Sequence, residues 1–176
     1  PAMTFLSRPA ASTTCRAERS DTAGSGPICA TTVASRSRSS AGMAPRATAR
    51  LAAASEVPIA VGESLYSIGQ FAAYVQQGAA SILQVDVARI GGITPWLKVA
   101  HLAESFNLAV CPHFLMELHV SLCAAVPSAA WVEYIPQLDA VASSRMEVAD
   151  GHAVAPDTPG LGIEWRWDEI RQRAKA

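Results

Sequence analysis

From residue 51 onward, short apolar runs alternate with segments that have helical hydrophobic periodicity. The runs at 57–62, 81–86, 108–112 and 129–133 are continuous rather than alternating, which is typical of strands buried on both faces. Helices are predicted between them at 67–78, 94–107 and 116–126, with Ser67 and Thr94 as the expected N-caps of the first two. This order predicts an α/β fold of parallel strands, either doubly wound or part of a (β/α) barrel.

Residues 1–48 are a different kind of sequence, rich in Ser, Thr, Ala, Gly, Pro and Arg and without strand or helix periodicity. Residues 1–50 hold seven Arg against two acidic residues, whereas 51–176 hold seven basic and thirteen acidic residues. The first part could be a disordered tail or a basic nucleic-acid arm, but it has no Lys and no interleaved aromatic residues. We therefore expect two parts, an irregular segment 1–48 and a folded domain 49–176, and no nucleic-acid partner.

The remaining bulk properties exclude further classes of protein. No apolar run approaches the ~20 residues of a membrane helix, so no membrane partner is expected. The four cysteines have neither CxxC nor metal-type spacing, which favours reduced thiols and a cytoplasmic location.

Each of the four predicted strands ends on an ionisable side chain: Glu63, Asp86, His113 and Glu133. Any one of them alone is more simply explained as a helix cap or a turn residue. Parallel strands, however, present their carboxyl ends at one edge, where α/β enzymes place their chemistry. Four in succession therefore predict one shared site. Arg89, Glu117 and His119 are weaker candidates near the same edge.

The motifs at these strand ends resemble those of a known family. GES at 62–64, QVDVARIGGITPWLKVAHLAE at 84–104, CPHF at 111–114 and WVEY at 131–134 are similar to the second half of the barrel in the enolase superfamily. The subgroup is that of mandelate racemase and the acid-sugar dehydratases. The resemblance runs from about residue 51 to the C-terminus and implies that 49–176 form strands five to eight of a TIM-type barrel.

The resemblance also implies a role for each residue. Glu63 matches the third carboxylate ligand of a Mg²⁺ ion, and Asp86 and His113 match a dyad whose histidine exchanges the proton α to a carboxylate. Glu133 matches the acid that hydrogen-bonds the developing enediolate. The implied substrate is a small hydroxy acid or sugar acid. GGITPWLK and PHFLMELH favour an acid-sugar dehydratase, while a racemase or epimerase of the same subgroup, and a non-catalytic remnant, stay open.

The same resemblance sets expectations about what the chain lacks. Members of the family have eight strands, so the lysine motif of the second strand and the metal carboxylates of the third and fourth are expected to be missing, with Glu63 as one ligand of three. We expect a fragment that is inactive alone and that self-associates through two open barrel edges. Segment 1–48 is explained either as disordered or as a product of a shifted reading frame.

Overall fold

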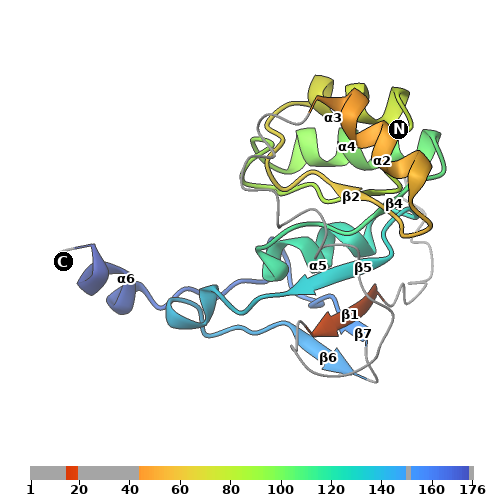
Figure 1. Ribbon diagram of the computed structural model, residues 1–176. Helices are drawn as coiled ribbons and strands as arrows, with labels where there is room; N and C mark the ends of the chain where they lie inside the picture. Colours follow the sequence, from red (N-terminus) through yellow and green to blue (C-terminus); the bar gives the residue numbers. More distant parts are fainter. Residues whose placement is uncertain (1–14, 20–43, 150–151, 175–176) are drawn as a thin grey trace, which may run out of the picture.

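The computed structural model describes residues 44–149 and 152–174, together with the backbone of residues 15–19. In its upper part, three helices lie on one side of a three-stranded sheet (Figure 1). The helices are α2 (Pro45–Ala54), α3 (Ile68–Gln76) and α4 (Ile93–Ser105), and the strands are β2 (Ala60–Val61), β3 (Ile82–Leu83) and β4 (Ala109–Val110).

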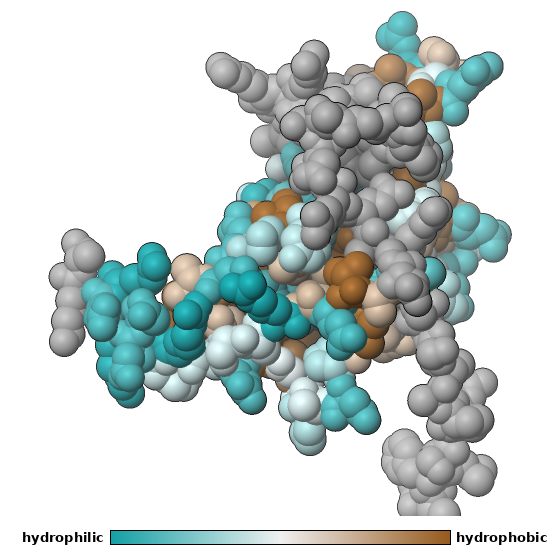
Figure 2. Space-filling model, turned by 90° about the horizontal axis from the view of Figure 1, so that it is seen from below, coloured by the Kyte–Doolittle hydropathy of each residue, from teal (hydrophilic) through white to brown (hydrophobic). Residues whose placement is uncertain are grey.

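The lower part combines a helix with a second sheet (Figure 1). Helix α5 (Met116–Ala124) lies against β5 (Trp131–Tyr134), which begins a sheet of order β5-β1-β7-β6. Its other strands are β1 (Cys15–Arg19), β6 (Glu147–Ala149) and β7 (His152–Val154). A 3₁₀ turn, η1 (Leu138–Ala140), precedes β6, and helix α6 (Trp167–Arg173) projects from the body with a largely hydrophilic surface (Figures 1 and 2).

The parallel sheet separates two apolar layers because successive side chains of a strand point to opposite faces. In β3, Ile82 joins a small cluster with Ala60 and Cys111, whereas the next residue, Leu83, lies in the main core. That main core includes Phe71 of α3. Both faces of the strand are thus buried, as the continuous apolar runs predicted.

Hydrogen bonds carry the sheet on from β4 toward β5. The Val110 N–H donates to Ser128 O at 2.8 Å, and the Ala130 N–H donates to Val110 O at 2.9 Å. Val110 and Ala129 form a parallel bridge. The order β2-β3-β4, followed by the segment leading into β5, is the order of four successive barrel strands with their helices outside. The predicted fold class, an α/β half-barrel, is therefore confirmed.

Of the two predicted helix N-caps, one is confirmed and the other is wrong. Ser67 does cap α3: its hydroxyl accepts from Gln70 N–H at 3.3 Å, and the Gln70 side chain accepts from Ser67 N–H at 3.2 Å. Thr94 as the cap of α4 is wrong, because the helix begins at Ile93 after an N-cap at Gly92. With Thr94 as the N-cap, Pro95 would be the first helical residue, whereas it lies within the first turn of the helix as observed. Any first-turn position tolerates proline, however, because N–H groups there have no partner within the helix.

One element lies within the stretch 1–48 that was expected to be irregular, and a second begins there. Strand β1 pairs in parallel with β5, in the register Arg16↔Trp131 to Arg19↔Tyr134, and helix α2 begins at Pro45. The edge of β5, expected to be open, is therefore paired. The rest of that stretch, residues 1–14 and 20–43, lies outside the described residues. Among the helices that the structure describes, none is long and apolar enough to cross a membrane.

One glycine, directly after β2, determines how closely that strand end approaches the end of β3. Gly62 has φ +146°, and a Cβ built there would lie 2.6 Å from the backbone carbon of Gln84. We expect Gly62→Ala to lower the free energy of unfolding by about 2 kcal/mol or more, since neither backbone can yield cheaply. Urea denaturation followed by circular dichroism measures this change.

Gly78→Ala is the matched control. Gly78 also has a positive φ, +62°, but a Cβ there meets nothing within 4 Å. Its replacement should cost only the left-handed backbone penalty of about 1 kcal/mol. Equal losses for the two variants would show that the contact with Gln84 is unimportant.

Candidate active site

Three successive strands deliver ionisable side chains to one edge of the sheet. Asp86 Oδ2 lies 3.2 Å from His113 Nδ1, and Glu63 Oε2 lies 3.7 Å from His113 Nε2. The imidazole thus stands between two carboxylates that follow β3 and β2. Its side chain is 14% exposed, so the ring is sheltered but reachable.

Asp86 is held rigidly by its own loop. The residue is 2% exposed, and its Oδ1 accepts from the N–H groups of Ala88 at 2.8 Å and Arg89 at 3.3 Å. Its Oδ2 faces His113 and also lies 3.5 Å from the Arg89 Nε. Because an ionised carboxylate only accepts, the hydrogen between the two residues belongs on His113 Nδ1. Nε2 is then the ring nitrogen that can exchange a proton.

Arg89 links the segment that follows β2 to the segment that follows β3. Its guanidinium Nη1 donates to the backbone oxygen of Glu63 and lies 3.4 Å from the Ser64 hydroxyl. This residue was a weaker candidate from sequence, and the structure places it against both Asp86 and Glu63. It supplies a positive charge beside the Asp86 carboxylate and a hydrogen bond to the Glu63 backbone.

Glu133 reaches the same edge from β5 and contacts the backbone beside His113. Its Oε2 accepts from the Phe114 N–H at 2.8 Å. Phe114 and Leu115 have positive φ values, +66° and +34°, which are costly for residues with side chains. All four sequence-predicted residues therefore lie at one edge, three in direct contact and Glu133 through the Phe114 backbone.

His119 was expected near the mouth but is fully buried on α5. Its Nδ1 lies 2.6 Å from Phe114 O, and its Nε2 accepts from the Val87 N–H at 3.1 Å. The available signal was its spacing, because Met116, Val120 and Cys123 lie on the same buried side of the helix. Burial lowers the pKa of His119 to about 4, partly offset by the hydrogen bond to Phe114.

The family's magnesium ion can be tested against these residues. Mg²⁺ needs several hard oxygen ligands in near-octahedral geometry. Within the described ranges, no three His, Cys, Asp or Glu side chains cluster in a way that could hold a metal ion. Glu63 is the one predicted ligand, and its carboxylate faces His113. The described residues by themselves therefore do not make a magnesium site.

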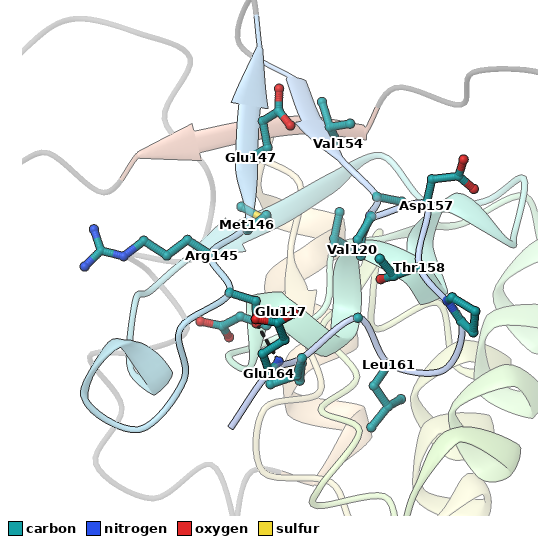
Figure 3. A pocket seen from close by; sticks show the side chains of 16 residues that line it. Glu117, Val120, Arg145, Met146, Glu147, Val154, Asp157, Thr158, Leu161 and Glu164 are labelled. Atoms are coloured by element: carbon teal, nitrogen blue, oxygen red, sulfur yellow. Dashed lines mark hydrogen bonds between the residues drawn. The ribbon is translucent and has the colours of Figure 1, made fainter. Parts of the chain in front are cut away.

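A hollow of about 700 Å³ lies elsewhere, between α5 and the segment around β6 and β7 (Figure 3). Glu117 lines it, but both carboxyl oxygens are buried and lack a hydrogen-bond partner among the described residues. Burial raises the pKa of this carboxyl group. Since the oxygens are shielded and none of the four strand-end residues lines the hollow, it is not the candidate active site.

Comparison with known proteins places the chain in a family. The family model described as "Enolase C-terminal domain-like" matches residues 41–169. That range contains every strand-end residue discussed above and most of the described elements.

Individual relatives agree. The L-talarate/galactarate dehydratase of Salmonella typhimurium LT2 is 39% identical over 127 residues, which are 69% of this chain and 32% of the relative. A crystal structure of L-talarate dehydratase from Polaromonas sp. JS666, complexed with Mg and L-glucarate, superposes with a TM-score of 0.68 at 41% identity, covering 72% of this chain and 36% of that one. A racemase from Streptomyces coelicolor A3(2) with bound magnesium has a TM-score of 0.68 at 34% identity, covering 72% and 35%.

The chain thus spans about a third of the length of the relatives it matches. Those relatives belong to the mandelate racemase/enolase superfamily and include acid-sugar dehydratases. With a family model matched over most of its residues and an architecture shared with these structures, the chain belongs to the enolase C-terminal domain-like family.

Proposed function

We propose that this chain carries the histidine–aspartate half of an acid-sugar dehydratase site, which moves the proton α to the carboxylate of an aldonate or aldarate. The observation that carries the proposal is the 3.2 Å contact between Asp86 Oδ2 and His113 Nδ1 at a shared strand edge. The contact orients the ring and leaves Nε2 for the substrate. The similarity to talarate and galactarate dehydratases supports the choice of substrate class.

His113 is the proton carrier in this scheme. Nε2 takes the α-proton, and the resulting imidazolium is stabilised by Asp86 at Nδ1 and by Glu63, whose oxygen lies 3.7 Å from Nε2. Loss of the β-hydroxyl then completes dehydration, with His113 able to return its proton to the leaving oxygen as general acid. Protonation of the carbon on its opposite face, by a second acid on that side, would give a racemase or epimerase instead. The similarity to the Streptomyces racemase supports that alternative.

Glu133 is assigned the role of hydrogen-bonding the enediolate as its negative charge develops. Its Oε2 accepts from Phe114 N–H, so Oε1 is the oxygen that would donate a hydrogen bond, and this requires a protonated carboxyl group. Magnesium, which the relatives' structures contain, supplies Lewis-acid stabilisation of an enediolate when bound. For this chain, Glu63 is the proposed contribution to such a site.

The first test is deuterium exchange. In D₂O with and without MgCl₂, washout of the α-proton of galactarate, galactonate or glucarate is followed by proton NMR. The proposed dyad predicts washout, whereas the inactive fragment expected from the sequence resemblance predicts none. His113→Asn should slow this washout by about 100-fold or more, the usual contribution of a positioned acid–base group. Formation of a keto acid marks a dehydratase, whereas exchange without loss of water marks a racemase.

His101→Asn is the control for that test, because His101 is an exposed histidine on α4. It should leave washout unchanged. Equal rates in wild type and His113→Asn would refute the assignment of His113. A wild type without any washout, with or without magnesium, would favour the non-catalytic remnant.

Asp86→Asn tests the orienting role separately. The amide keeps an oxygen for the N–H groups of Ala88 and Arg89, so the fold should persist. Its NH₂ group, however, cannot accept from His113 Nδ1, which favours the wrong tautomer. We expect washout to fall by about 100-fold or more with an unchanged circular dichroism spectrum. A fall of less than about threefold would mean that Asp86 does not govern the ring.

We also propose self-association, now through one sheet edge. β2 ends the order β2-β3-β4, so its outer edge carries no strand among the described residues, and Val57 just before it is 43% exposed. Unpaired strand edges recruit further strands. Multi-angle light scattering should give a mass above that of one 18.5 kDa chain. A monodisperse monomer at all concentrations would contradict this.

A further inference from the structure

A single buried imidazole joins the two segments that carry the dyad. His119 Nδ1 lies 2.6 Å from Phe114 O, and Nε2 accepts from Val87 N–H at 3.1 Å. Phe114 directly follows His113, and Val87 directly follows Asp86. The ring of His119 therefore spans from the end of β3 to the end of β4, from the core side of the sheet edge.

Only one protonation state satisfies both contacts. A carbonyl oxygen accepts and a backbone N–H donates, so Nδ1 must carry hydrogen and Nε2 must carry none. Burial holds the pKa of His119 at about 4, which keeps the ring neutral at neutral pH. The neutral Nδ1–H form is the one that bridges Val87 and Phe114.

The bridge acts on a residue that needs support. Phe114 has φ +66°, a conformation that persists only where its surroundings fix it. Its N–H donates to Glu133 at 2.8 Å, and its carbonyl meets His119 at 2.6 Å. Both backbone polar groups of this strained residue are thereby hydrogen-bonded, and His113 is attached directly to it.

The core in turn holds the bridge. His119 is fully buried next to Trp96, with ring centroids 6.1 Å apart, and the Trp96 Nε1 donates to Val85 O at 3.3 Å. Val85 precedes Asp86. The segment around Asp86 is thus fastened on both sides, by Trp96 at Val85 and by His119 at Val87.

We propose that His119 is a positioning residue that sets the Asp86–His113 contact by clamping Val87 and Phe114. The inference rests on the proposed function for its catalytic meaning, but the clamp itself can be tested without turnover. His119 does not face the substrate edge, so it acts through its neighbours rather than by touching the reacting atoms.

The test compares three variants of the ¹⁵N-labelled chain. His119→Phe keeps a ring and removes both hydrogen bonds. His119→Gln introduces a side-chain amide whose oxygen can replace Nε2 as the acceptor for the Val87 N–H. Met116→Leu changes another fully buried side chain of α5 at nearly constant volume and controls for core packing.

Amide hydrogen exchange and the His113 Nδ1–H proton resonance report on the clamp. We expect exchange at Val87 to be roughly tenfold faster in His119→Phe, restored toward wild type in His119→Gln, and unchanged in Met116→Leu. The Val110 amide, bonded to Ser128, is the internal reference. The downfield His113 Nδ1–H signal should be present in wild type and lost in His119→Phe. Unchanged Val87 exchange, or a persisting His113 signal, would overturn the proposal.

Kinetics add a second readout. In an active wild type, His119→Phe should lower kcat for deuterium washout about tenfold with KM unchanged, and His119→Gln should recover part of it. An unaltered kcat in His119→Phe would overturn the positioning role. If the wild type shows no washout, the proposed function fails, and the amide and imidazole signals alone decide for or against the clamp.

Discussion

The parallel register of β3 and β4 is the constraint on which the site depends. Leu83 pairs with Val110, and Asp86 and His113 each follow their strand residue by three positions. Equal offsets from paired residues bring the two side chains to the same height, where Oδ2 and Nδ1 meet at 3.2 Å. A slip of one residue would move one side chain out of level and turn it to the other face. The buried faces of both strands prevent that slip.

This dependence explains which parts of the site were predictable from sequence. The dyad could be found because apolar runs mark the strands, and residues counted from their ends fall at one edge. His119 was placed at the mouth as a weaker candidate, and its bridging role could not be predicted because its partners are the backbone groups of Val87 and Phe114. Thr94 was mistaken for a cap since the two glycines before Ile93 already allow the helix to begin earlier. The pairing of β1 with β5 was equally hidden, because CRAER at 15–19 is only five residues long, carries three charged residues and has no β-branched or aromatic residue.

Glu63 occupies a position where two roles compete. As an oxygen 3.7 Å from His113 Nε2, it would lie beside the imidazolium that the proposed mechanism forms. As a metal ligand it would instead be drawn toward the cation, and its interaction with the ring would weaken. The choice between these roles depends on oxygen ligands beyond the described residues. Arg89, which donates to the Glu63 backbone, fixes where the residue starts without fixing where its carboxylate points.

The buried polar side chains next to the dyad are hydrogen-bonded, whereas one on the far side of α5 is not. Asp86 and His119 are both buried, and each is bonded to backbone groups of the strand-end segments. Leaving such groups unpaired would cost about 1–3 kcal/mol each, so the folded core favours the arrangement that satisfies them. Glu117, on the same helix as His119, is buried without a partner among the described residues and lines the hollow between α5 and the segment around β6 and β7. The hydrogen bonds of the core, rather than the exposed loops, therefore determine where the His113 imidazole lies.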